Sequence, residues 1–167
     1  MYSAPMLTDA QDYVIRPLRA ADEPILWEML YQALQSAENA AAPSRDIVRQ
    51  PDYAKYVEAW GREGDLGFVA HDVNHDHALG AVWCRLSLTQ KVGGIENVPD
   101  LAFAVRSGHR RRGIGASLLT NWVRANPEQS AVRLRVAPTS SAVRLYERFG
   151  FKVVHESAGA VTMRRDA

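Results

Sequence analysis

The stretch from Leu101 to Leu119, LAFAVRSGHRRRGIGASLL, constrains the fold of this chain more than any other. In its first five residues large apolar side chains alternate with alanines, a pattern that predicts a strand buried on both faces. From Ile114 to Val123 apolar residues recur at helical spacing, which predicts a helix. The chain therefore passes from a buried strand through a short turn directly into a helix.

Three arginines and two glycines form that turn, in the order Arg110-Arg111-Arg112-Gly113-Ile114-Gly115. Glycine lets the backbone turn tightly and lets another molecule approach its N–H groups. Because the helix begins at this point, its unpaired N–H groups and the positive end of its dipole face the same space as the arginines. The combination predicts a site for a phosphate or pyrophosphate. The alternative is a glycine-rich turn with a solvated arginine cluster.

Two nucleotide-binding fingerprints do not fit this turn. A Walker loop requires a lysine after its last glycine, and none follows here. The dinucleotide-binding fingerprint requires a third glycine at the position that Leu118 occupies.

A second motif, SAVRLYERFGF, runs from Ser141 to Phe151. It predicts a helix that ends at Gly150, a residue that can adopt the left-handed conformation of a helix end. The chain then enters a strand. Between the two motifs, Val132 to Val136 predicts a further strand.

Together the two motifs resemble the GNAT (Gcn5-related N-acetyltransferase) superfamily. Its acetyl-CoA loop has Gln or Arg, two residues, Gly, one residue, then Gly or Ala; Arg110, Gly113 and Gly115 fill the defined positions. Its later segment is N-x-x-A-x-x-L-Y-E-x-x-G-F, and the matching residues are Ala142, Leu145, Tyr146, Glu147, Gly150 and Phe151. The resemblance implies an α+β domain with a mixed, mostly antiparallel sheet. In such a domain, the strands Leu101–Val105 and Val132–Val136 are parallel neighbours that splay apart around the cofactor.

The resemblance also implies an acetyl-CoA-dependent N-acetyltransferase that moves an acetyl group directly to a primary amine. The pantetheine arm would lie against the backbone of Phe103, Ala104 and Val105. The residues expected to hold the pyrophosphate are Arg110, Arg111, Arg112, Gly113, Ile114, Gly115 and Ala116. The family asparagine that bonds the arm is missing, and either Thr139 or Ser140 stands in its place.

Two residues are candidates for the proton transfers. Tyr146 corresponds to the family's general acid, and a phenol suits this task because its pKa lies above that of a thiol. Asp100, at the entry to the first strand of the pair, is the candidate base, with Glu96 or water in reserve, because an ammonium must lose a proton before it can attack. Their alternatives are a tyrosine packed at the edge of the core and a solvated aspartate.

The N-terminal half is the expected acceptor side. An Asp22-capped helix and a second helix over about Ser44 to Gly61 are predicted, with Tyr31 and Tyr56 as candidate substrate contacts. On the strand predicted from Ala78, Trp83 and Arg85 share one face by the period of two and are further candidates. They would otherwise be a packed indole and a solvated guanidinium.

Composition limits the class of protein. The chain has 167 residues, a net charge of +1 and 47% hydrophobic residues, which fits one globular domain over residues 1–167 with a loose start over 1–12. One cysteine, Cys84, and no long apolar run or signal pattern predict a cytoplasmic location without membrane attachment. A homodimer is compatible with the resemblance.

Three other functions are weighed against this one. A non-catalytic acetyl-CoA sensor or assembly module would not need Tyr146. A nucleic-acid-binding module would use the arginines, but the near-neutral net charge argues against it. A metal site at His71, His75 and His77 lacks a distant ligand, so we expect no metal, and polar residues are typical of a hairpin turn.

Overall fold

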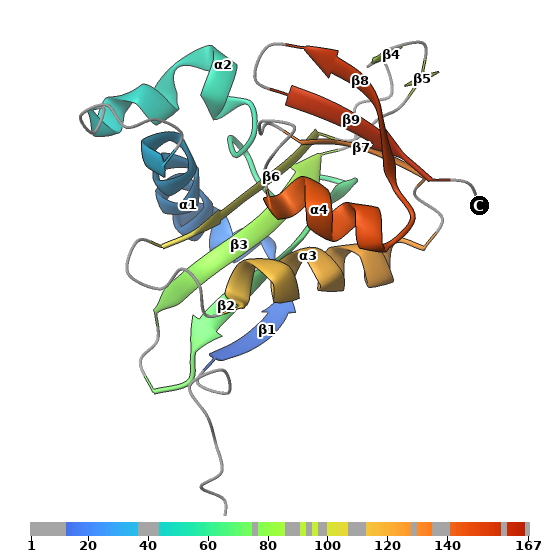
Figure 1. Cartoon of the computed structure of the whole chain (residues 1–167). Helices are drawn as coiled ribbons and strands as arrows, with labels where there is room; N and C mark the ends of the chain where they lie inside the picture. Colours follow the sequence, from blue (N-terminus) through green and yellow to red (C-terminus); the bar gives the residue numbers. More distant parts are fainter. Residues whose placement is uncertain are drawn as a thin grey trace, which may run out of the picture.

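A seven-stranded mixed sheet with the order β1-β2-β3-β6-β7-β9-β8 forms the centre of the molecule (Figure 1). The computed structural model describes residues 13–36, 44–74, 77–85, 91–92, 95–96, 100–106, 113–127, 130–134, 141–157 and 160–165. The strands are β1 (Tyr13–Pro17), β2 (Asp65–Asp72), β3 (Ala78–Arg85), β6 (Asp100–Val105), β7 (Ala131–Leu134), β8 (Lys152–Ser157) and β9 (Ala160–Arg164). All neighbouring strands are antiparallel except the parallel pair β6 and β7. The predicted α+β fold and its central parallel pair are confirmed.

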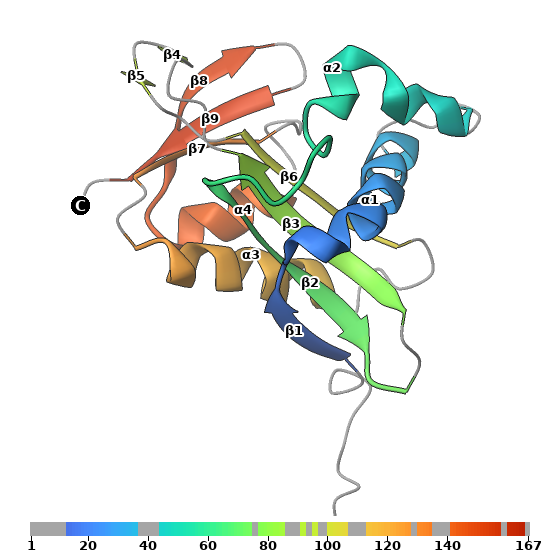
Figure 2. The ribbon, with the colours of Figure 1, turned by 180° about the vertical axis from the view of Figure 1, so that it is seen from behind.

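Helices cover both faces of this sheet. The helices α1 (Glu23–Ser36) and α2 (Pro51–Ala54) lie on one face, and α3 (Ile114–Ala125) and α4 (Ser141–Arg148) lie on the other (Figures 1 and 2). Along β3, Val82 and Cys84 belong to the core beneath α3 and α4, whereas Ala81 and Trp83 belong to the core beneath α1 and α2. This alternation follows from the period of two in a strand.

The approach to α1 is organised by Asp22. The predicted helix start is correct to within one residue. The Asp22 carboxylate, however, accepts a hydrogen bond from the backbone N–H of Arg19, which precedes it in the chain, at 2.6 Å. It also forms an ion pair with the Arg16 guanidinium at 2.8 Å. The hydrogen bond from Arg16 is the main cause that holds the pKa of Asp22 below its ordinary value.

The helical stretch predicted over about Ser44 to Gly61 is present only in part. The structure has a short 3-10 helix (Arg45–Arg49), the single turn of α2 and then a non-helical turn over residues 55–59. In a continuing helix the carbonyl groups after Ala54 would accept from the next helical turn. Here three of them accept from side chains of β3 instead, and Ala59 takes a positive φ of 57°.

The helix α3 packs closely on β3 because residue 80 is glycine. A Cβ atom at Gly80 would lie 2.8 Å from the Ala104 carbonyl oxygen and 3.2 Å from Leu118 Cδ1.

The segment predicted as a loop between Gln90 and Asp100 contains a small two-stranded sheet of β4 (Lys91–Val92) and β5 (Ile95–Glu96). In the described part of the chain, no helix is long and apolar enough to cross a membrane.

Candidate functional site

The strands β6 and β7 are parallel neighbours, and β7 is described as far as Leu134. Within the described residues, their pairing comprises Asp100 with Arg133 and Leu101 with Leu134. On its other side β6 stays paired with β3 along its whole length, from Asp100 to Val105. The backbone of Phe103, Ala104 and Val105, predicted to lie against the cofactor arm, follows the last described pair with β7.

The N-terminus of α3 lies just beyond the end of β6. Gly113, immediately before the helix, has φ +79° and ψ 4°, a left-handed conformation that favours glycine. The Gly113 carbonyl accepts the first helical bond, from the Ser117 N–H at 2.9 Å, so the N–H groups of Ile114, Gly115 and Ala116 precede the helical ladder. A Cβ at Gly115 would lie 3.6 Å from Val105 Cγ2, which ties this terminus to β6. Arg110, Arg111 and Arg112 lie outside the described residues.

Tyr146 on α4 is fully buried, at 0% exposure. Its ring centroid lies 5.4 Å from that of Phe151, and its hydroxyl oxygen has no hydrogen-bond partner in the described part of the chain. Burial, and to a lesser extent the proximity of Cys84, raises the pKa of Tyr146 far above its ordinary value. A buried hydroxyl without a partner is costly, and such groups in folded proteins call for an explanation such as a ligand.

Tyr146 belongs to the larger buried cluster of the molecule. Leu101 and Leu134, the last described residue pair between β6 and β7, belong to the same cluster, as does Cys84. The Tyr146 ring is thus part of the core that also contains the paired start of β6.

Asp100 begins β6 between two arginines in register: Arg85 on β3 and Arg133 on β7. The structure describes the position of Asp100 in the strand but not its side chain, and the same holds for Glu96 on β5. Thr139 and Ser140 lie outside the described residues. Their roles stay predictions.

The candidate acceptor residues lie on the α1 and α2 face. Tyr31 is largely buried, and the Arg45 guanidinium lies 4.5 Å from its ring centroid. Trp83 has no exposed surface, and its indole N–H donates to the Tyr56 carbonyl at 3.1 Å. Arg85 forms an ion pair with Asp65 at 3.1 Å, so its guanidinium is neither solvated nor open toward a pocket.

A carboxylate that sequence analysis missed lies on the same face. Glu28 on α1 accepts from Arg45 at 2.6 Å and from Gln32 at 3.0 Å, and Arg106, which directly follows β6, lies 3.6 Å away. Burial works to raise the pKa of Glu28, but these hydrogen bonds and charges outweigh it and lower the pKa. Arg45 and Arg106 come from elements other than α1, so no local motif could have indicated these two partners.

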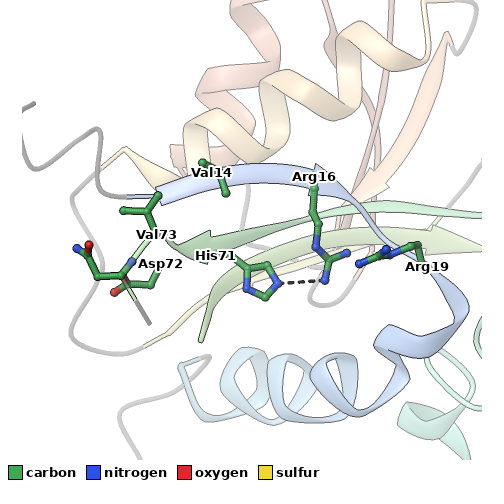
Figure 3. A pocket seen from close by; sticks show the side chains of 7 residues that line it. Val14, Arg16, Arg19, His71, Asp72 and Val73 are labelled. Atoms are coloured by element: carbon green, nitrogen blue, oxygen red, sulfur yellow. Dashed lines mark hydrogen bonds between the residues drawn. The ribbon is translucent and has the colours of Figure 1, made fainter. Parts of the chain in front are cut away.

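A pocket at the edge of the sheet contains the histidine once considered for metal binding. It has a volume of about 620 Å³ and is lined by Val14, Arg16, Arg19, His71, Asp72, Val73 and Asn74 (Figure 3). His71 Nε2 lies 3.1 Å from Arg16 Nη2, so a guanidinium faces the nitrogen that a metal would need. No group of three His, Cys, Asp or Glu side chains among the described residues could hold a metal ion, and His75 lies outside them.

The acetyltransferase (GNAT) domain family matches residues 62–153, more than half of the chain. The chain belongs to the GNAT family. The matched range of this GNAT protein runs from β2 to the start of β8 and includes β6, α3 and α4. It leaves out α1, the 3-10 helix and α2.

Solved structures agree with this assignment. PH1933 from Pyrococcus horikoshii OT3 is 26% identical to this GNAT protein, with a TM-score of 0.65 over 93% of this chain and 99% of that chain. A GCN5-related N-acetyltransferase from Kribbella flavida is 20% identical, with a TM-score of 0.62 over 94% and 99%. A GNAT family acetyltransferase from Brucella melitensis, solved with acetyl-CoA, is 19% identical, with a TM-score of 0.58 over 93% and 89%. A search of curated proteins gives no match.

Proposed function

We propose that this GNAT protein is an N-acetyltransferase that moves the acetyl group of acetyl-CoA directly to a primary amine of a small molecule or peptide. The observation that carries the proposal is the buried Tyr146 hydroxyl, which has no hydrogen-bond partner among the described residues. It belongs to the cluster that includes the last described pair of β6 and β7. A hydroxyl there can serve a ligand that enters between the two strands.

The backbone of β6 and the N-terminus of α3 suit a molecule with a peptide-like arm and a pyrophosphate. The backbone of Phe103, Ala104 and Val105 can bond such an arm much as a neighbouring strand would. The N-terminus of α3, from Gly113 to Ala116, suits a pyrophosphate, supported by Arg110, Arg111 and Arg112. Thr139 or Ser140 supplies a hydroxyl for the arm. The complex of the Brucella melitensis relative with acetyl-CoA supports this choice of donor.

Acetyl-CoA supplies a thioester, and side chains of this protein move the protons. Asp100, or Glu96 or water in its place, accepts a proton from the acceptor ammonium and frees the lone pair that attacks the carbonyl carbon. The Val105 N–H donates to the carbonyl oxygen as it gains charge. Tyr146 then donates its phenolic proton to the departing thiolate, and the proton that the nitrogen loses as the amide forms restores the phenol, the form that the raised pKa of Tyr146 favours.

Calorimetric titration with acetyl-CoA, CoA and ATP tests the donor. We expect the two CoA species to bind and ATP not to bind, and acetyl-CoA at a hundred times its Kd to stabilise the fold by about 2.7 kcal/mol. A panel of spermidine, kanamycin, the L-amino acids and alanyl peptides, followed by release of free thiol, then tests transfer. Absence of CoA binding would contradict the proposal, whereas binding without thiol release from any amine would favour a non-catalytic sensor.

A further inference from the structure

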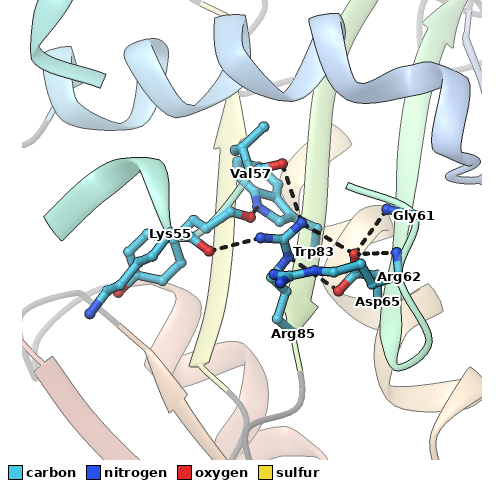
Figure 4. Close-up of polar contacts among 8 residues, drawn as sticks. Lys55, Val57, Gly61, Arg62, Asp65, Trp83 and Arg85 are labelled. Carbon is cyan, nitrogen blue, oxygen red and sulfur yellow. Dashed lines mark hydrogen bonds and ion pairs between the residues drawn. The ribbon is translucent and has the colours of Figure 1, made fainter. Parts of the chain in front are cut away.

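Three successive backbone carbonyl groups after α2 are held by two side chains of β3 (Figure 4). Arg85 Nη1 donates to the Lys55 carbonyl at 3.0 Å, and Arg85 Nη2 donates to the Val57 carbonyl at 3.3 Å. Trp83 Nε1 donates to the Tyr56 carbonyl between them at 3.1 Å. We call this set of bonds the carbonyl clamp. It fixes the turn that replaces the expected continuation of the helix.

Asp65 on β2 anchors the clamp. Its Oδ1 accepts from Arg85 Nε at 3.1 Å and its Oδ2 from Arg85 Nη2 at 3.3 Å. The Asp65 side chain is 5% exposed and that of Arg85 12%. Asp65 Oδ2 also accepts from the backbone N–H groups of Gly61 and Arg62, each at 2.9 Å (Figure 4). One buried ion pair therefore holds both ends of the segment 55–62.

The bonds of Arg85 leave it little capacity for a ligand. A guanidinium has five N–H donors. Those of Arg85 serve two carboxylate oxygens and two carbonyl groups, and the Trp60 ring centroid lies 5.4 Å from its central carbon. The geometry is that of an internal support and not of a side chain waiting for an anion.

The clamp ends on the strand next to the candidate reaction centre. In the register of β3 with β6, Arg85 is the partner of Asp100, and Trp83 is the partner of Ala102. The segment 55–62 is thus tied, through two positions on one face of β3, to the start of β6. In enzymes, a misplacement of about 1 Å between a bound reactant and a catalytic group can cost roughly a hundredfold in rate.

We propose that Arg85, held by Asp65, is a positioning residue that sets the wall of the acceptor site relative to Asp100, and that it does not touch the acceptor. The wall consists of the segment 55–62 and carries Tyr56. The inference deepens the proposed function and rests on it for the catalytic role, whereas the clamp itself can be tested without any substrate.

The first test is the rate of trypsin cleavage after Lys55 in Arg85→Met. The bond that trypsin cuts there carries the Lys55 carbonyl, which Arg85 holds in the wild type. Cleavage requires local opening, so loss of the clamp should accelerate it by about tenfold or more. Arg165→Met is the matched control. Arg165 also donates to a backbone carbonyl, of Pro127 at 3.1 Å, and its guanidinium lies 4.8 Å from the Phe151 ring centroid. It directly follows β9, which β6 and β7 separate from β3 in the sheet. An unchanged rate in Arg85→Met, or an equal rise in both variants, would overturn the clamp.

The second test separates positioning from direct contact with the acceptor. In Arg85→Met we expect the acceptor KM to rise about tenfold or more for both spermidine and the best-accepted amino acid of the panel, while the acetyl-CoA Kd stays within about twofold. A rise for the carboxylate-bearing amine alone would show direct contact and overturn the proposal. An equal loss of acetyl-CoA binding would overturn it as well.

A milder variant covers the case in which Arg85→Met does not fold. Trp83→Phe removes the single bond to the Tyr56 carbonyl and keeps most of the ring, so it should show the same changes at smaller size. If wild-type protein binds no acetyl-CoA, the proposed function and the acceptor role fail together. The trypsin result then still decides whether the clamp exists.

Discussion

The two faces of the central sheet are held together by different kinds of contact. Beneath α3 and α4 the contacts are mostly apolar, and two buried polar atoms, the Tyr146 hydroxyl oxygen and Trp122 Nε1, have no partner among the described residues. On the α1 and α2 face, ion pairs join separate elements: Arg85 with Asp65, Arg45 with Glu28, and Arg16 with Asp22. The family match covers α3 and α4 and leaves out α1. We infer that the first face handles the donor and that the second selects the acceptor.

The largest effects should come from a pair of leucines, one on each face. Leu118 on α3 and Leu26 on α1 are both 0% exposed. Truncation of either to alanine should lower the free energy of unfolding by about 2–5 kcal/mol, which urea titration measures. Because Leu118 seats α3 over Gly80, Leu118→Ala should also weaken acetyl-CoA binding, by about tenfold, and Leu26→Ala should not. Equal weakening by both would remove the distinction between the faces.

Acidification should have a smaller effect on stability, through the ion pairs of the α1 and α2 face. The pKa of Asp22 is lowered, chiefly by the hydrogen bond from Arg16, so the folded state favours the carboxylate. This stability is present above the usual pKa of 3.8 and is lost as the pH falls through the lower pKa of the folded state. Unfolding free energies measured against pH should therefore fall less steeply below pH 3.8 in Asp22→Asn than in the wild type.

The exposed Asp52 on α2 provides the control for that experiment. Asp52→Asn should leave the pH profile of stability as it is in the wild type. An identical profile for Asp22→Asn would show that the ion pair at the entry to α1 contributes no pH-dependent stability.

The two faces of the sheet also differ in how much of their structure could be predicted from the sequence. On the donor face, local patterns indicated the left-handed Gly150 and the helix between Ile114 and Ala125, which depend on residues close together in the chain. The parallel pairing of β6 and β7 joins residues far apart in the chain, and it was implied by the family resemblance.

The acceptor face depends on contacts between residues far apart in the chain. Residues 55–59 have a helical pattern, yet Arg85 and Trp83 take their carbonyl groups and override it. Asp65 and Arg85 are separated by 20 positions, and Glu28 and Arg45 by 17. No spacing rule connects such pairs, so neither the clamp nor the environment of Glu28 could be predicted.

Tyr146→Phe is the most direct test of the account, with unfolding and turnover measured on the same protein. If the hydroxyl is kept for a ligand, its removal deletes an unsatisfied buried group, so stability without acetyl-CoA should be unchanged or higher. Turnover should fall by about a hundredfold or more, with the acetyl-CoA Kd within about threefold. A loss of stability of about 1–3 kcal/mol with turnover close to that of the wild type would contradict the account, because the hydroxyl would then serve the fold and not the reaction.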